Sequence, residues 1–191
     1  MRNLLFISLI TLFMQSCAPL VGTVGMVSLG AASKEKGLGT SINDSLIKTK
    51  ISNLIYKYNR DLIADTKIFV NNGSVLYTGK LNNPNDKIEF TKLAWNIRGV
   101  KEVNNEIQVT VKSSLKNIAR DIASMGEIRA RIMSDQSINS VNFSIDVVND
   151  TAYISGVATN ELEMNLVKSH ASSARFIKEV FNYIILNKDT R

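Results

Sequence analysis

The hydrophobic pattern of the chain becomes regular after residue 40. Apolar side chains recur there at helical spacing, at Ile47, Ile51, Leu54, Ile55 and Tyr58. This spacing predicts an amphipathic helix. Two apolar runs follow, residues 67–71 and 74–80, with Asn71-Asn72-Gly73 at their junction. They predict a β-hairpin, because Asn-Gly suits the positive φ angles of a tight primed turn.

A second helix and a third strand follow this hairpin. Phe90, Leu93, Ala94 and Ile97 again have helical spacing. From Val103 to Val111, apolar residues alternate with polar ones, which predicts a strand with one polar face. The order helix, strand, strand, helix, strand predicts an α+β unit. Its simplest layered form is a three-stranded mixed sheet with both helices on one face.

The chain contains this unit twice. A shift of 77 residues places Ile68 on Ile145 and needs no gap. Further matched pairs are Gly79 with Gly156, Ala94 with Ala171, Arg98 with Arg175, and Lys101-Glu102-Val103 with Lys178-Glu179-Val180. Each copy of such a repeat is one structural unit. We therefore expect two domains, residues 41–112 and 113–188, and the short linker favours contact between them.

Two segments of the first copy carry a family resemblance. They are residues 72–79, Asn-Gly-Ser-Val-Leu-Tyr-Thr-Gly, and residues 99–105, Gly-Val-Lys-Glu-Val-Asn-Asn. The hairpin, the glycine that closes its second strand and the Gly-Val step before the last strand resemble the BON domain. The resemblance extends from residue 41 to about residue 186 and implies two tandem BON domains.

The second copy departs from the BON pattern at two places. Asp150 replaces the turn glycine, and Phe176-Ile177 replaces Gly99-Val100. The fold accommodates both changes, but a binding role of the missing glycines does not carry over to the second copy.

The amino-terminal residues have the layout of a secretory signal peptide. Arg2 is basic, and no charge follows from Leu4 to Met14. Met14-Gln15-Ser16-Cys17 resembles the lipobox of bacterial lipoproteins, which implies a signal peptide at 1–16, cleavage before Cys17 and acylation of Cys17 with fatty acids such as palmitate. Residues 17–40, rich in Gly, Ala, Val and Ser, then form a lipidated tether.

The lipobox also implies a location. Ala18 follows the cysteine, which by resemblance to enterobacterial lipoproteins favours the outer membrane, with the chain facing the periplasm. The alternative is an uncleaved anchor with a free cysteine, because no charge occurs from Leu4 to Ser33. Pro19 and three glycines weaken a continuous helix there.

Composition argues against an enzyme. The chain has one Cys and one His, so it has no intrachain disulfide, no zinc site of several thiolates and no all-histidine metal site. No nucleophile elbow, P-loop, zinc-protease motif or dinucleotide motif occurs. His170 aligns with Leu93 on the core stripe of the second helix, which favours a packing role. We expect no catalytic residues, no metal and no cofactor.

Charge is uneven between the copies. Residues 41–112 hold eleven Lys plus Arg against seven Asp plus Glu, whereas residues 113–191 hold nine of each. A basic first copy is attracted to an anionic membrane surface. The alternative is a solvated face that only aids solubility. Nucleic acid is not an expected partner of a periplasmic lipoprotein.

The helix that opens the second copy carries the candidate lipid-binding residues. Met125, Arg129 and Met133 share a stripe beside Arg131. Methionines can enter the acyl boundary while guanidinium groups bind phosphate oxygens. The alternative is that both methionines pack against the first domain. The BON resemblance implies phospholipid binding but does not single out these residues.

A second surface is a candidate interface. On the last strand, the polar face of the first copy becomes Phe181, Tyr183 and Ile185 in the second, and Tyr153 should project to the same side. An exposed apolar sheet face needs a partner. We expect this face to pack against the first domain or a second molecule.

These observations favour a non-enzymatic outer-membrane lipoprotein that binds anionic phospholipids and supports envelope integrity, as the resemblance implies. The alternative function is a structural adaptor that docks on an envelope protein assembly through the apolar sheet face. A small-ligand binding module ranks last, because sheets of this size leave little room for a pocket. The oligomeric state stays open.

Overall fold

The computed structural model describes residues 37–110 and 114–187, with side chains from residue 40. Residues 31–191 belong to one compact unit, which holds both copies of the repeat. The signal peptide, Cys17 and most of the tether, expected within residues 1–40, lie outside the described residues. Part of the linker at 112–116 lies outside them too.

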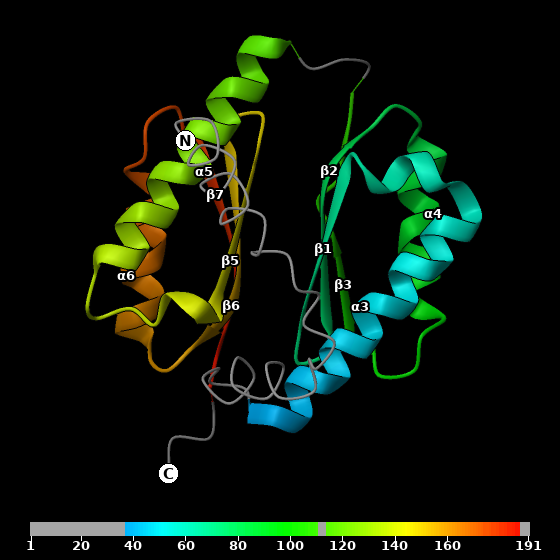
Figure 1. Ribbon diagram of the computed structural model, residues 1–191, viewed down its shortest axis with the longest axis horizontal. Helices are drawn as coiled ribbons and strands as arrows, with labels where there is room; N and C mark the ends of the chain where they lie inside the picture. Colours follow the sequence, from blue (N-terminus) through cyan, green and yellow to red (C-terminus); the bar gives the residue numbers. More distant parts are fainter. Residues whose placement is uncertain (1–36, 111–113, 188–191) are drawn as a thin grey trace, which may run out of the picture. The chain divides into compact units, whose positions relative to one another are not determined.

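The first repeat has the expected order of elements (Figure 1). Its elements are α3 (Gly37–Asn59), the short 3-10 helix η2 (Arg60–Ile63), β1 (Thr66–Asn71), β2 (Ser74–Leu81), α4 (Pro84–Trp95), β3 (Glu102–Asn105) and β4 (Gln108–Val109). The last strand, expected as one run, is thus divided into two pieces. Both pieces pair with β2 in the same register, with Tyr77 opposite Asn105 and Lys80 opposite Gln108.

The second repeat has the same order. Its elements are α5 (Leu115–Ser134), the 3-10 helix η3 (Ser140–Asn142), β5 (Phe143–Val148), β6 (Thr151–Ala158), α6 (Glu161–Ser172) and β7 (Glu179–Leu186). In each repeat the middle strand pairs antiparallel with the strand before it and parallel with the last strand. The fold is therefore two tandem α-β-β-α-β units with mixed sheets, and the predicted α+β class is confirmed.

Each hairpin turn is fixed by its backbone and by one carboxylate. Asn72 and Gly73 have φ angles of 51° and 82°, as a primed turn requires. The Asp44 carboxylate on α3 accepts hydrogen bonds from both of their amides, at 2.9 and 3.0 Å. Asp121 on α5 holds the second turn in the same way. A buried aspartate on the first helix of each repeat therefore fixes the turn.

The two repeats have separate hydrophobic cores. In the first, Ile51 and Ile55 of α3 and Phe90 of α4 pack with β1 and β2. In the second, Ile128 and Ile132 of α5 pack with β5, β6 and α6. Both helices of a repeat thus cover the same face of its sheet, as predicted.

Tyr58, which lies on the predicted apolar stripe of the first helix, does not enter the core. Tyr58 is 46 % exposed, and its hydroxyl donates a hydrogen bond to Asp86 Oδ1 at 2.7 Å. It lies in the last turn of α3, close to the end of the helix at Asn59. There its phenol bonds to the first turn of α4 instead of entering the core.

Candidate functional site

Helix α5 presents two apolar stripes to different surroundings. Ile128 and Ile132 enter the core and are at most 2 % exposed. A second stripe, the outward stripe, is exposed to solvent: Leu115, Ile118, Ile122 and Met133 are 86, 42, 60 and 74 % exposed. The helix begins after Ser114, whose side chain accepts a hydrogen bond from the Asn117 amide. An exposed apolar stripe along one helix is a candidate binding surface.

The four predicted lipid-binding residues on α5 lie in unlike environments. Met133 is exposed, whereas Met125 is half-buried and packs against the second core. Arg129 donates a hydrogen bond to the Ile145 carbonyl at 3.4 Å and forms no ion pair within the described residues. Arg131 forms an ion pair with Glu127 at 2.7 Å. Of the two arginines, Arg129 is therefore the one with its charge available.

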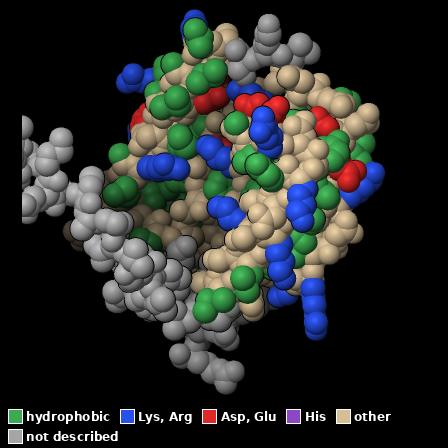
Figure 2. Space-filling view, turned by 45° about the vertical axis from the view of Figure 1, so that its right-hand side comes forward, with side chains coloured by type: hydrophobic (Ala, Val, Ile, Leu, Met, Phe, Trp, Pro, Cys, Tyr) green, Lys and Arg blue, Asp and Glu red, His purple; other side chains and the backbone are tan. Residues whose placement is uncertain are grey.

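The first repeat carries the basic surface expected from its charge. With α3 and α4 turned forward, Figure 2 shows Lys and Arg side chains running down this face, while Asp and Glu side chains gather towards its upper part. On α3, Lys48 holds the position of Met125 and Tyr56 that of Met133, and the exposed apolar residues there include Ile42, Leu46 and Tyr56, at 52, 51 and 60 %.

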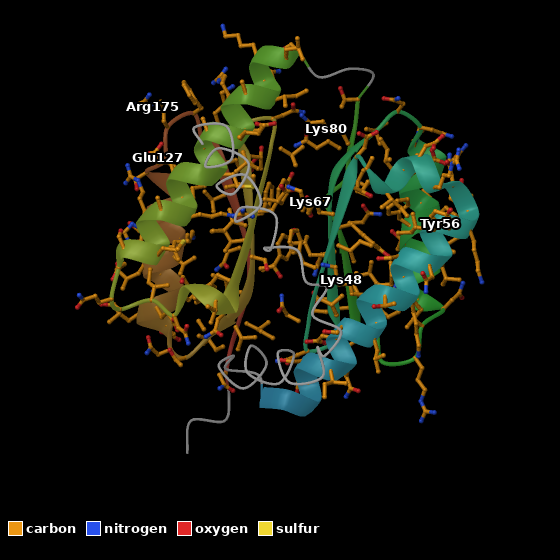
Figure 3. All side chains as sticks on the ribbon, viewed as in Figure 1. Lys48, Tyr56, Lys67, Lys80, Glu127 and Arg175 are labelled. Atoms are coloured by element: carbon orange, nitrogen blue, oxygen red, sulfur yellow. The ribbon has the colours of Figure 1, made fainter. Side chains whose placement is uncertain are left out.

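A groove of about 460 Å³ separates α5 from the first repeat. Ile118, Ile122 and Met125 line it from α5, and Lys67 and Lys80 line it from the first repeat. Both lysines lie between the repeats in Figure 3. The α5 side of the groove is thus mainly apolar with one carboxylate, Asp121, and the first repeat contributes the two lysines beside Asp65.

The two lysines are held by carboxylates of the second repeat. Lys67 forms an ion pair with Asp146, and Lys80 forms one with Asp121 at 3.3 Å. Asp146 also accepts a hydrogen bond from Thr78 Oγ1 at 2.5 Å and is almost fully buried. These contacts join the repeats and neutralise the two lysines of the groove.

The apolar sheet face of the second repeat lies against the first repeat. Tyr153 stacks on Phe181 with ring centroids 5.5 Å apart, so both project from the same side of the sheet. Tyr153 packs in one cluster with Leu76, and Phe181 and Tyr183 pack against this cluster. Ile185 is half-buried. The face is therefore covered within the chain.

Polar bonds surround this cluster. Asn71 Nδ2 donates to Ser155 Oγ at 2.6 Å in a buried position. Tyr183 donates to Glu106 Oε1 at 2.6 Å, and burial together with this bond raises the pKa of the Tyr183 hydroxyl. These contacts leave no signal in the sequence, because side chains that bond between repeats have no characteristic spacing.

His170 is half-buried, and its Nε2 lies 2.8 Å from Asp135 Oδ2. The hydrogen bond from His170 lowers the pKa of the Asp135 carboxyl. Among the described residues, no group of three or more His, Cys, Asp or Glu could hold a metal ion. None of the described helices is long and apolar enough to cross a membrane.

The fold and the comparison with known families agree on the class of protein. The BON domain model matches residues 43–111 and 126–188, one match in each repeat. The chain belongs to the BON family, with two BON domains.

Curated relatives share this tandem region. An uncharacterised protein in the gshII 5' region of Anaplasma centrale is 32 % identical over 146 residues, which cover 76 % of this chain and 95 % of the relative. The outer membrane lipoprotein DolP of Haemophilus influenzae is 27 % identical over 91 % of this chain and 92 % of its own. The osmotically-inducible protein Y of Escherichia coli is 22 % identical over 76 % of this chain and 73 % of its own.

Proposed function

We propose that the protein is a periplasm-facing outer-membrane lipoprotein, anchored by Cys17, that binds anionic phospholipids and supports envelope integrity without catalysis. The lipobox-like segment, the two BON domains and the similarity to DolP, an outer membrane lipoprotein, support this proposal. The observation that carries it is the outward stripe of α5.

The stripe has the chemistry of an interfacial helix. Its exposed apolar side chains can enter the boundary between headgroups and acyl chains. Arg129 lies on the same helix and can bind lipid phosphate through its guanidinium fork. Each inserted Ile or Leu contributes about 1–2 kcal/mol, and each basic side chain at an anionic surface contributes about 1 kcal/mol.

The four predicted lipid-binding residues on α5 have different roles in this proposal. We propose that Arg129 and Met133 contact lipid together with Leu115, Ile118 and Ile122. Met125 and Arg131 support them, since Met125 packs on the second core and Arg131 is paired with Glu127.

The structure gives little support to the alternative adaptor function. It required an open sheet face at Tyr153, Phe181, Tyr183 and Ile185. Leu76 and Phe69 pack against this face and leave Phe181, Tyr183 and Ile185 half-buried, which reduces the area that an external partner can contact. We therefore do not propose the adaptor function.

Vesicle sedimentation tests the lipid role. The compact unit, residues 31–191, is expected to bind vesicles that contain phosphatidylglycerol more tightly than pure phosphatidylcholine vesicles, and less tightly as salt increases. Ile122→Ser combined with Arg129→Gln should weaken this binding roughly thirtyfold, because about 2 kcal/mol of contact is lost.

The matched control is Ile88→Ser combined with Arg60→Gln. Ile88 lies on α4 and is 54 % exposed, so the control removes the same kinds of side chain elsewhere. Binding of the control should equal that of the wild type. Absence of phosphatidylglycerol-dependent binding, or an equal loss in both variants, would refute the lipid role.

A further inference from the structure

The two hairpin turns differ in what lies beside them. At the turn of the first repeat, a pocket of about 580 Å³ is open to solvent. Lys50, Arg98 and Lys101 line it, together with Gly73 and Gly99. None of the three cations forms an ion pair within the described part of the chain.

The equivalent place in the second repeat holds a carboxylate. Asp150 stands where the first repeat has Gly73, and it is only 7 % exposed. Its Oδ2 lies 2.9 Å from Lys178 Nζ and 3.1 Å from Arg120 Nη2. Lys178 is the counterpart of Lys101. A side chain of the second repeat thus supplies an anion to the lysine that in the first repeat has none.

An aromatic ring also occupies the location in the second repeat that is equivalent to the turn pocket. Phe176 replaces Gly99 and has a φ angle of 68°, a conformation that is costly for an aromatic residue. The Arg120 guanidinium lies over this ring, 4.7 Å from its centroid. In the first repeat Gly99 places no side chain there, and a Cβ at this position would lie 3.2 Å from Ile47 Cδ1.

The remaining basic position of the pocket has the opposite charge in the second repeat. Glu127 replaces Lys50 and accepts a hydrogen bond from the Arg175 amide at 3.0 Å (Figure 3). That bond, followed by the one from Arg131, lowers the pKa of the Glu127 carboxyl. Glu127 is therefore held as an anion within the second repeat.

The charges confirm the difference between the two places. In the second repeat, three cations (Arg120, Arg175 and Lys178) face three carboxylates (Asp121, Glu127 and Asp150). In the first repeat, the charged residues that line the pocket, among those described, are three cations (Lys50, Arg98 and Lys101) and one carboxylate (Asp44). The charges therefore cancel at the turn of the second repeat, whereas the turn pocket of the first repeat keeps an excess of positive charge.

Asp44 does not prevent an anion from binding. Its two oxygens accept the amides of Asn72 and Gly73. Its counterpart Asp121 makes the same two bonds while Asp150 lies in the adjacent place. A carboxylate at this position is therefore compatible with a second anion beside the turn.

We propose that the first repeat binds a phosphate group in this turn pocket, through Lys50, Arg98 and Lys101. A phosphate has enough oxygens for three cations, and an arginine fork suits it. Gly73 and Gly99 place no side chain where Asp150 and Phe176 lie in the second repeat, and a Cβ at Gly73 would come within 2.5 Å of the Gly99 carbonyl oxygen. This site is separate from the α5 stripe and does not rest on the proposed lipid role of that helix.

Nuclear magnetic resonance of the full chain in neutral detergent micelles tests the site. Inorganic phosphate, added at constant ionic strength, should shift the Gly73 and Gly99 amide signals saturably. Soluble glycerophosphate and phosphatidylglycerol bicelles are then compared. Shifts with glycerophosphate indicate a free phosphate ligand, whereas shifts with the bicelles alone indicate a lipid headgroup; either result supports the site.

Paired substitutions give the control. Arg98→Gln with Lys101→Gln should weaken phosphate binding at least about tenfold, because two charged hydrogen-bond donors are lost. Arg175→Gln with Lys178→Gln removes the same charges from the second repeat and should leave the affinity within about twofold. The four substituted side chains are all exposed, so we expect both double variants to keep the fold. No saturable shift with any of the three probes, or equal weakening in both variants, would overturn the proposal.

Discussion

Lys80 of the first repeat lies 3.3 Å from the Asp121 carboxylate of the second, and both side chains are largely buried. The same carboxylate accepts the amides of Asn149 and Asp150 at the second hairpin turn. Asp121 therefore has two roles: it fixes a turn within its own repeat, and it binds the first repeat.

These two roles can be separated by substitution. Asp121→Asn should lower the free energy of unfolding by about 3 kcal/mol, because the turn loses an acceptor and Lys80 is left without its partner. Lys80→Met removes only the contact between the repeats and should cost less. Urea unfolding measures both values. If the two variants lose equal stability, the turn contribution of Asp121 is absent.

Tyr77 provides a second prediction. It is fully buried and packs edge-on against Phe90, with centroids 5.4 Å apart. Its hydroxyl has no hydrogen-bond partner among the described residues. Tyr77→Phe removes an unsatisfied polar group and keeps the ring, so the free energy of unfolding should stay equal or rise by up to about 1 kcal/mol.

Tyr77 should also contribute to alkaline unfolding. Burial raises the pKa of its hydroxyl above the ordinary value of 10.0. The folded state then holds this proton more tightly than the unfolded state. The contribution of Tyr77 to stability is therefore constant below about pH 10 and decreases above it. Thermal melting against pH should show a smaller alkaline loss for Tyr77→Phe than for the wild type. An identical loss would contradict the assignment to Tyr77.

Much of the fold could be predicted from the sequence because its signals are local. Asn72-Gly73 specifies a turn by its own φ angles, and Ile47, Ile51 and Ile55 specify a helix by their spacing. The repeat extends these signals to the second unit, although Asn149-Asp150 takes the place of Asn-Gly at its turn. Tyr58 was misplaced because periodicity cannot tell where a helix leaves the core.

The candidate sites were less accessible to sequence analysis. The outward stripe of Leu115, Ile118 and Ile122 has helical spacing and could have been found. The turn pocket could not, because its cations Lys50 and Lys101 are separated in sequence and meet only through the fold. The partners of Lys67 and Lys80 lie in the other repeat, which no local pattern indicates.

Acylation of Cys17 is a separate prediction that rests on the lipobox resemblance. The mature chain should begin at Cys17, with acyl groups on its sulfur and amino group. Mass measurement of the amino-terminal peptide checks this, and Cys17→Ser should abolish palmitate labelling and move the chain out of the membrane fraction. An unmodified cysteine in an uncleaved chain would instead support the alternative anchor.

Asp150 offers a test of the comparison between the two turns. Asp150→Gly gives the second turn the residue found at Gly73, and the φ angle of 62° suits glycine. The variant should lose about 1–2 kcal/mol of stability, because Arg120 and Lys178 lose their carboxylate while the backbone strain at a positive φ angle is relieved.

Phosphate should restore part of the lost stability of this variant by binding in place of the Asp150 carboxylate. At about ten times its dissociation constant, one bound phosphate adds about 1.4 kcal/mol. The melting temperature should therefore rise more with phosphate in the variant than in the wild type, with chloride at equal ionic strength as the control. Equal rises in the two proteins would show that Asp150 does not stand in for a bound phosphate.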